Sequence, residues 1–448
     1  MRRSRLVPAL LALAAVLALP ATARAELRTE TLRAGPYTLG EYKTEMMKLQ
    51  VPRPKASGYV TYMHSQLVDR RGRVITIQDG MLHHVFFKNM DRYRVAGICN
   101  SRQKEVFYGT GEENQALDLP RGYGYRLARR DRWEMSGMLM SHRYHRKKVW
   151  VQYKVSVDTA RRTGVRPMWV RANGCGRSSI YNVTGDGPPG SVHDQVYRWR
   201  VPMTGRIVAA GGHLHGGAVN MQMREPSCRN RVLFDHKPSY APQSHILYNV
   251  KPRLHEAGPI QTSWFSSRTG IPVSKGEVLN LHGLYENNHA RAAVMAITHV
   301  YMDPRARVPN GCVPLPEDAH QSRPKPGTRP SAPYQPIPLY RLDRRHQPVH
   351  VPEPPGPAKM LRDGATIALR AFRFQPEKVT VNAGSTINWN FRDVARHSIS
   401  LASGPRVVGP QAGTKGEKGS MRFTTPGRYQ LFCYLHPMTM REQVTVLP

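Results

Sequence analysis

Apolar and polar residues alternate over short runs along most of this 448-residue chain, and few stretches repeat apolar residues at helical spacing. From Val149 to Val157 the sequence V-W-V-Q-Y-K-V-S-V places a β-branched or aromatic residue at every second position. Such alternation is typical of strands that bury one face. The pattern therefore predicts an all-β protein, and the length suggests two or three domains.

The longest apolar run, Leu6 to Leu19, lies near the N-terminus, after M-R-R-S-R and before A-T-A-R-A. A basic start, a short apolar centre and small residues at the end indicate a secretory signal peptide, residues 1–25, cleaved after Ala25. The run is too short to span a bilayer comfortably, although an N-terminal membrane anchor is the alternative. We expect an exported protein, periplasmic or secreted, with no transmembrane segment in its mature form.

Prolines gather between Pro304 and Pro357, which hold 15 of the 37 in the chain. Proline at this density disfavours helices and central strands, so residues 304–362 are expected to form an extended, semi-rigid linker. A loop signal, G-D-G-P-P-G-S from Gly185 to Ser191, further divides the part before the linker. The expected domains are residues 26–190, 191–303 and 363–448.

The net charge is +35, from 66 basic and 31 acidic residues. The basic residues are spread along the chain without a nucleic-acid-binding motif, and an exported protein rarely meets nucleic acid. We therefore expect no nucleic acid partner, and instead attraction to an anionic envelope surface or to an acidic protein. An arginine-rich proteome explains the composition equally well.

The strongest chemical signal lies in C-Y-L-H-P-M-T-M, where Cys433, His436 and Met440 share a short loop between two strand-like runs. A thiolate, an imidazole and a thioether together suit copper, and His397 in D-V-A-R-H-S-I-S can supply a second imidazole. The set His397, Cys433, His436 and Met440 predicts a blue, type 1 copper site for electron transfer. Met438 competes with Met440 for the axial position. The structural alternative is a buried free cysteine beside an incidental histidine.

The C-terminal region, from Asp363 to Pro448, resembles the plastocyanin-like cupredoxins. The resemblance is carried by F-x-F-x-P-x-x-V-T-V-x-A-G from Phe372 to Gly384, by G-R-Y-Q-L-F-C-Y-L-H-P, and by M-R-E-Q-V-T-V. It implies a Greek-key β-sandwich with one copper that exchanges electrons with a redox partner protein or a small reductant.

Four cysteines besides Cys433 remain in a chain that we expect to be exported, where disulfides are stable. Three pairings are compatible with the sequence. We predict the pairs Cys99–Cys175 and Cys228–Cys312, one in each of the first two domains.

Two histidine pairs occur in strand-like runs before the linker. M-L-H-H-V-F-F contains His83 and His84, which lie on opposite faces of a regular strand and could share an ion only at a bulge. G-G-H-L-H-G-G contains His213 and His215, which lie on one face, with glycines that allow close backbone approach. Either pair alone is a weak metal signal.

Residues 26–303 also resemble the stress up-regulated nodulin family, through Leu119 to Tyr125 (L-P-R-G-Y-G-Y), Arg132-Trp133 and Gly211 to His215. More distantly they resemble the copper type II ascorbate-dependent monooxygenases, such as peptidylglycine hydroxylating monooxygenase. That resemblance implies two jelly-roll-like β-sandwiches with one copper each.

The monooxygenase resemblance also implies two ligand sets. The first is His83, His84 and His142, with His145 as a neighbouring alternative to the third ligand. The second is His213, His215 and Met295, with Met302 as a competitor. It further implies hydroxylation of a C–H bond, with the C-terminal domain supplying electrons. The other interpretation is not enzymatic: the C-terminal domain shuttles electrons or stores copper, and the remainder is a binding module. No residue pattern identifies a substrate.

Overall fold

The computed structural model describes residues 26–448 except 78, 96–101, 176–178, 251–252, 306, 310, 333, 336, 338, 351–352 and 410. The expected signal peptide and Cys99 lie outside this part. Regular structure in the described residues is almost entirely β, with two 3-10 helices, η1 (Pro226–Cys228) and η2 (Ile246–Tyr248). Among the same residues no helix is long and apolar enough to cross a membrane. The predicted all-β architecture of successive sandwiches is confirmed.

The first sandwich packs two sheets around a core of aromatic and aliphatic side chains. One sheet has the order β1-β9-β3-β7-β10 with β6 beside β3, and the other has the order β2-β8-β4-β5. Their bounds are β1 (Leu27–Leu39), β2 (Thr44–Val51), β3 (Gly58–Val68), β4 (Met81–Tyr93), β5 (Lys104–Gly111), β6 (Leu117–Asp118), β7 (Tyr123–Leu127), β8 (Trp133–Met140), β9 (Lys147–Asp158) and β10 (Thr163–Gly164). In β9 the alternate residues Val149, Val151, Tyr153, Val155 and Val157 are at most 1% exposed, which explains the alternation seen in the sequence.

The second sandwich pairs a sheet of order β11-β22-β14-β19-β23 with one of order β13-β20-β15-β16, and β12 pairs with β21 beside them. The bounds are β11 (Arg166–Arg171), β12 (Tyr181–Val183), β13 (Val192–Arg200), β14 (Gly205–Leu214), β15 (Ala218–Glu225), β16 (Arg231–Asp235), β17 (Pro238–Ser239), β18 (Gln261–Thr262), β19 (Phe265–Val273), β20 (Val278–Glu286), β21 (Arg291–Val294), β22 (Ala296–Pro304) and β23 (His320–Gln321). Because β11 and β12 already pair with this sandwich, the strands change partner between Gly164 and Arg166. The sequence had suggested a change near residue 190.

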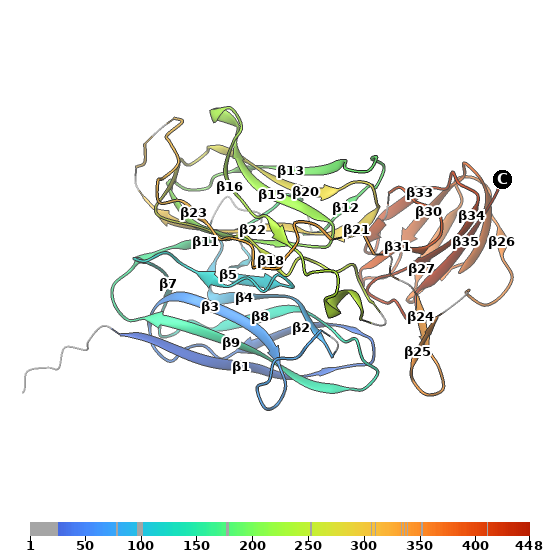
Figure 1. The fold of residues 1–448 in the computed structure, drawn as a ribbon, viewed down its shortest axis with the longest axis horizontal. Coiled ribbons are helices and arrows are strands. Elements are labelled where there is room, and N and C mark those ends of the chain that lie inside the picture. The colour runs from blue at the N-terminus through green and yellow to red at the C-terminus, as the bar shows by residue number, and fades with distance from the viewer. Residues whose placement is uncertain are drawn as a thin grey trace, which may run out of the picture.

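The two sandwiches lie one on the other (Figure 1) and share apolar side chains. Val208, Ala209 and Tyr301 of the second sandwich belong to the same buried cluster as the first sandwich's core. The Tyr301 hydroxyl donates a hydrogen bond to the carbonyl of Phe107 in β5, at 3.0 Å. This stacking brings β4, which carries His83 and His84, close to the end of β14, where His213 and His215 lie.

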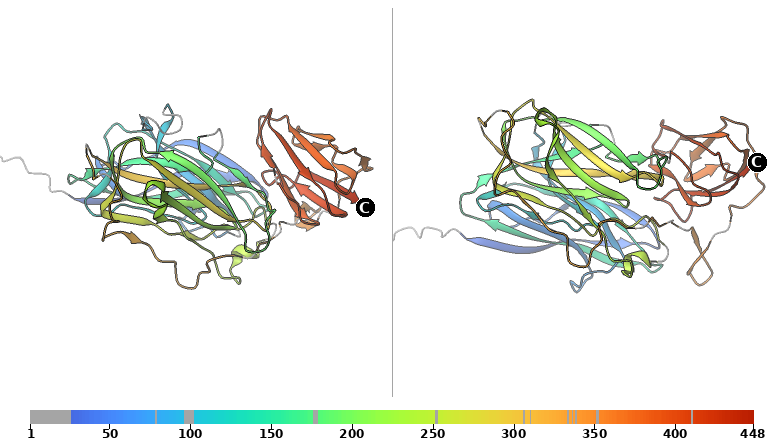
Figure 2. Two further views of the ribbon diagram at one scale, coloured as in Figure 1. Left: turned by 90° about the horizontal axis from the view of Figure 1, so that it is seen from above. Right: turned by 45° about the horizontal axis from the view of Figure 1, so that its top comes forward.

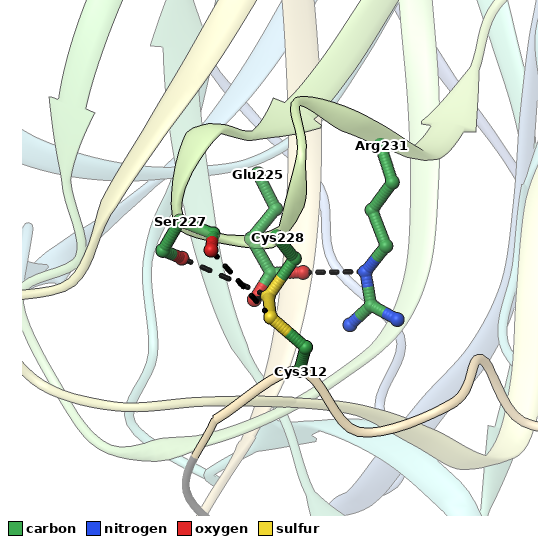
Figure 3. Close-up of a disulfide and its surroundings, with 5 residues drawn as sticks. All are labelled: Glu225, Ser227, Cys228, Arg231 and Cys312. Carbon is green, nitrogen blue, oxygen red and sulfur yellow. Dashed lines mark hydrogen bonds and ion pairs between the residues drawn. A yellow bond between two sulfur atoms is a disulfide. The ribbon is translucent and has the colours of Figure 1, made fainter.

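The proline-rich segment follows the second sandwich over its first part instead of extending freely from it. A disulfide joins Cys312 to Cys228 in η1 (Figure 3), which confirms the predicted pair. Further along, β23 pairs with β19, and Arg329 forms a β-bridge with Tyr240. Proline lacks an N–H but is tolerated at sheet edges, where one side of the strand needs no partner. Cys175 is also disulfide-bonded, but its predicted partner Cys99 lies outside the described residues.

The C-terminal sandwich lies at one end of the stacked pair (Figures 1 and 2), after a hairpin of β24 (Tyr340–Leu342) and β25 (Pro348–His350). Its sheets have the orders β26-β29-β35-β34-β31-β32 and β28-β27-β30-β33, with the parallel pairs β26–β29, β29–β35 and β27–β30. The bounds are β26 (Lys359–Met360), β27 (Thr366–Arg370), β28 (Arg373–Gln375), β29 (Lys378–Asn382), β30 (Thr386–Phe391), β31 (His397–Ser403), β32 (Gln411–Gly413), β33 (Lys418–Arg422), β34 (Gly427–Phe432) and β35 (Arg441–Leu447).

Hydrogen bonds attach the C-terminal sandwich to the second one. The Arg406 guanidinium donates to the carbonyl of Gly187 at 2.9 Å and also to that of Gly185. The Gly409 N–H donates to the carbonyl of Thr184 at 2.9 Å. The loop from Gly185 to Ser191, which the sequence marked as a boundary, is therefore a docking point for the C-terminal sandwich.

Candidate metal centres

In the C-terminal sandwich, three of the four predicted copper ligands converge. His397 begins β31, and Cys433 and His436 follow β34. Their ligand atoms all lie within 4.8 Å of one another. The Cys433 Sγ is 3.5 Å from Nδ1 of His436 and 3.9 Å from Nδ1 of His397. Two imidazoles and one thiol thus face a common point.

The methionines of the loop differ in burial. Met440 is fully buried in the apolar cluster that also contains Cys433, whereas Met438 is only partly buried. Backbone hydrogen bonds close the loop: the N–H of Met440 donates to the carbonyl of His436 at 2.9 Å, and the N–H of Cys433 to the carbonyl of Met440 at 3.1 Å. This ring of bonds brings Met440 back beside Cys433, as an axial ligand requires.

The Cys433 thiol is fully buried and accepts a hydrogen bond from the N–H of Ser398 at 3.3 Å. Burial raises the pKa of this thiol, and the N–H of Ser398 only partly offsets the effect. A thiolate here therefore needs a nearby cation, which a copper ion provides. The donor set and its burial fit copper.

His397 is oriented by Asp393, whose Oδ2 lies 2.9 Å from Nε2 of the imidazole. The backbone N–H groups of Ala371 and Phe372 hold that carboxylate at 2.9 and 3.0 Å. Nδ1 of His397 is thereby left to face the sulfur, in the arrangement by which metal-bound histidines are usually supported. For His436, burial and then the charge of His397 lower the pKa to about 4, so the ring is neutral at pH 7 and able to bind metal.

Between the first two sandwiches, the two histidine pairs meet. In β4 the pairing with β8 is irregular between Leu82 and His84, which is the bulge that an adjacent ligand pair requires. Nδ1 of His83 lies 3.0 Å from Nδ1 of His84. The ring centroids of His83 and His215 are 5.2 Å apart, and those of His84 and His213 are 6.1 Å apart. The two histidine pairs therefore form one connected group, and the ring of His255 lies 5.0 Å from that of His83 between centroids. We call these five residues the histidine cluster: His83, His84, His213, His215 and His255.

Glu112 and His255 complete this group, and the sequence reasoning missed both. Nε2 of His255 lies 2.7 Å from Glu112 Oε1, and Nε2 of His83 lies 3.7 Å from the same oxygen. The ligand atoms of the three residues lie within 4.8 Å of one another, a spacing that a metal ion can fill. The only sequence signal was a pair of acidic residues after β5, because His255 stands alone in an irregular loop.

The protonation states around Glu112 suit metal binding, because ligands must be deprotonated. Burial lowers the pKa of His83 well below its usual value, with Glu112 opposing the effect. For Glu112, burial raises the pKa, but His255 and His83 outweigh it and lower the pKa to about 2. The site thus offers neutral imidazole and carboxylate at pH 7.

Four buried ring nitrogens near this site have no hydrogen-bond partner: Nδ1 of His142, Nε2 of His213, Nε2 of His215 and Nδ1 of His255. Buried polar atoms are rarely left unsatisfied, since each costs about 1–3 kcal/mol. Glu113 accepts from Nδ1 of His213 at 3.0 Å and so leaves its Nε2 directed elsewhere. Orphaned nitrogens with carboxylate support are typical of metal-binding histidines.

The two other predicted ligands, His142 and Met295, lie at the edge of the histidine cluster. His142 follows β8 and is buried; burial first, and then His255, lower its pKa to about 4, yet it is outside the three-residue ligand group. Met295 lies between β21 and β22, half-buried beside His84 and His213 in a common pocket. Their competitors are less suitable, since His145 is exposed and Met302 is fully buried in the second core.

A pocket of about 90 Å³ lies between the histidine cluster and the C-terminal sandwich. His83, His215 and His255 line one side, and Ser400, Leu401 and Tyr434 line the other. Tyr434 directly follows Cys433 in the chain. The volume suits a few water molecules or a very small solute.

Comparison with known proteins identifies the C-terminal sandwich. Residues 364–447 match the family of copper binding proteins described as the plastocyanin/azurin family. Amicyanin-alpha from Methylorubrum extorquens is 29% identical over 83 residues, which is 18% of this chain and 69% of that protein. Amicyanin from Paracoccus versutus is 28% identical over 99 residues, or 21% of this chain and 73% of that protein. The crystal structure of the Paracoccus versutus amicyanin matches at 26% identity over 19% of this chain and 82% of that chain, with a TM-score of 0.18. The C-terminal sandwich is a copper-binding, electron-transfer domain of the plastocyanin/azurin family.

Proposed function

We propose that this chain is an exported copper protein whose C-terminal domain passes single electrons to a metal ion held in the histidine cluster. The observation that carries the proposal is the position of Tyr434. Its backbone is bonded to that of Cys433, the predicted thiolate ligand, and its side chain lines the same pocket as His83, His215 and His255. A copper ion bound at each centre supplies one-electron chemistry.

The residues between the two centres form a short and fixed connection. The Tyr434 N–H donates to Oγ of Ser398 at 3.0 Å, and Ser398 in turn donates its N–H to Cys433 Sγ. Tyr434 packs against a small apolar cluster formed by Leu339, Ala402 and Phe432. The tyrosine is thus held in place from both the proline-rich segment and the C-terminal sandwich.

In the first domain pair we propose one or two further coppers, with ligands drawn from His83, His84 and His142 and from His213, His215 and Met295. The orphaned ring nitrogens and the support from Glu112 and Glu113 favour metal binding over a structural role. Export rests on residues 1–25 and their resemblance to a signal peptide. The redox partner is a protein or a small reductant, and the positive net charge favours an acidic partner or an anionic envelope surface.

Copper content of the full-length mature protein, combined with its visible spectrum, tests the proposal. We expect more than one copper per chain and an intense blue band from the thiolate–copper transition. Replacing His83 and His255 together with Ala should lower the copper content while the blue band persists. If the wild-type chain binds one copper only, the chain is an electron carrier without a second centre.

A second candidate function is a copper monooxygenase, which would use the same centres. It is favoured by a pocket of about 520 Å³ that opens onto His84, His213 and Met295, on the other side of the cluster from Tyr434. The balanced reaction would convert a C–H bond and dioxygen to an alcohol and water, with two protons and two electrons, the electrons supplied singly by an external reductant. Oxygen consumption that depends on a reductant and is lost in His213→Ala would support this function.

A further inference from the structure

The 520 Å³ pocket beside His84 and His213 has a distinctive chemical lining. Aromatic side chains form one wall, with Phe86 and Trp169 in edge-to-face contact at 5.4 Å between centroids. Imidazoles of His84, His213 and His299 line the same pocket, and Trp169 packs against His299 at 4.6 Å. Its volume falls in the range of sites for small organic ligands, about 300–1,000 Å³.

Positive charge dominates this pocket. Six basic residues line it against the single acidic residue Glu134, namely Lys48, Lys88, Arg94, Arg102, Lys104 and Arg171. Glu134 is engaged by Lys88 at 3.1 Å and by Lys48 at 3.8 Å. Among the described residues that line the pocket, Glu134 is the one carboxylate, so basic side chains outnumber acidic ones there.

Arg94 and Arg171 lie close enough in this pocket for their positive charges to repel one another. Nε of Arg94 is buried without a hydrogen-bond partner. Burial and then the charge of Arg171 lower the pKa of Arg94 to about 10. Both guanidinium groups line the pocket, and Arg171 donates to Oγ of Ser179 at 3.3 Å. Guanidinium groups bind carboxylates with good geometric match, and an anion would relieve the repulsion between these two.

We propose that this pocket binds a small aromatic carboxylate, with its anionic group at Arg94 and Arg171 and its ring against Phe86 and Trp169. The ring of such a ligand would extend toward His84 and His213. The inference rests on the monooxygenase candidate for its consequence, because it names the substrate class of that site. Binding itself requires no metal and can be measured separately.

Titration of the metal-free, full-length protein with benzoate tests the inference by calorimetry and by Trp169 fluorescence. We expect benzoate to bind at least tenfold more tightly than benzyl alcohol, which has the ring without the charge, and more tightly than inorganic phosphate. Affinity should fall as salt is raised, since the interaction is between charges. Trp169→Phe identifies the fluorescence change that comes from the pocket.

Arg94→Gln and Arg171→Gln should each weaken benzoate binding about tenfold or more, whereas the exposed Arg198→Gln outside the pocket should leave it unchanged. The thermal unfolding of the variants, followed by tryptophan fluorescence and circular dichroism, reports whether the first two sandwiches are still folded. If a Gln variant misfolds, the competition between benzoate and benzyl alcohol in the wild-type protein still decides the matter. Equal affinity for the two compounds overturns the inference, and so does salt-independent binding. Copper content is a separate measurement, so failure here leaves the proposed electron transfer intact.

Discussion

The two candidate metal centres are built in opposite ways. In the C-terminal sandwich, Cys433, His436 and Met440 come from one loop, and only His397 comes from another strand end. The histidine cluster instead draws its members from β4, from the end of β14 and from the irregular loop at His255, with Glu112 from the turn after β5. The first centre depends on one loop that is closed by its own hydrogen bonds, whereas the second depends on the stacking of two sandwiches. A defect in that stacking should therefore empty the cluster and leave the blue site intact.

Both centres nevertheless use a carboxylate to orient an imidazole. Asp393 holds His397, Glu113 holds His213, and Glu112 contacts His255. The difference is the position of the carboxylate. Asp393 lies behind the ring, away from the sulfur, while Glu112 lies between two imidazoles and can be a ligand itself. This contrast predicts different ion preferences for the two centres.

Removing the sulfur should have the largest effect. Cys433→Ser removes the thiolate, so the copper-loaded chain should lose its blue band completely, as visible absorption will show. The copper bound by the histidine cluster should remain, because none of its ligands comes from that loop. A persistent blue band would mean that the thiolate comes from elsewhere.

Replacing Glu112 should give the opposite result, a loss of metal from the histidine cluster alone. Glu112→Gln removes a negative ligand atom and should lower the metal affinity of the cluster by on the order of 100-fold, with an unchanged blue band. Equilibrium dialysis against a copper chelator measures the affinity. His145→Ala is the matched control, since that histidine is exposed and near His142 in sequence. An equal loss in both variants would contradict the assignment of Glu112.

The axial position should show a smaller effect, confined to the reduction potential of the blue site. Met440→Leu removes a weak donor that favours the oxidised ion, so the potential should rise. Met438→Leu should change it less, because that side chain lies outside the buried cluster. Voltammetry of both variants makes the comparison, and a larger shift for Met438→Leu would exchange the two assignments.

The smallest effect concerns a second buried glutamate, Glu442, which contrasts with Glu112. Its one side-chain partner is the indole N–H of Trp389, at 3.0 Å. Burial raises its pKa to about 8, although Trp389 opposes the shift. Because the folded-state pKa lies above the unfolded one, the protonated group's stabilisation is complete below about pH 4.5 and is lost as pH rises through about 8.

Glu442→Gln keeps the acceptor for Trp389 but cannot ionise. The variant should therefore raise Tm at pH 8.5 by at least about 4–8 °C, the shift that about 1 kcal/mol produces in a domain of this size. At pH 5 the two proteins should melt together. Loss of the blue band on heating reports the C-terminal domain alone, and the same Tm difference at both pH values would refute the assigned ionisation.

The sequence predicted what is local and left open what depends on long-range contacts. The alternation in β9 is found in the structure, and β4 has the bulge that an ion shared by His83 and His84 would require. The predicted Cys228–Cys312 disulfide is also found, although its cysteines are 84 residues apart. The set around Cys433 was recognisable because its residues follow in fixed order within one loop. Glu112 and His255 were not, because they are separated by 143 residues and only the stacking of the sandwiches brings them together.

The extent of the second sandwich was also beyond local reasoning. Gly185 to Ser191 has the composition of a loop, but composition does not say which sheet the preceding strands join. Likewise, high proline content predicts an extended chain without saying what it lies against. The path of residues 320–329 depends on pairing with β19 and with Tyr240, which no spacing in the sequence encodes.

The attachment of the proline-rich segment also bears on kinetics. The Cys228–Cys312 disulfide and the pairing of β23 hold the start of this segment on the second sandwich, and Arg406 docks the domain that follows. A carrier that diffuses must meet its acceptor, so its rate falls on dilution, whereas a carrier fixed on the same chain works at an effective concentration that dilution does not change. Transfer within this molecule would be first order, and each acceptor would have one dedicated donor.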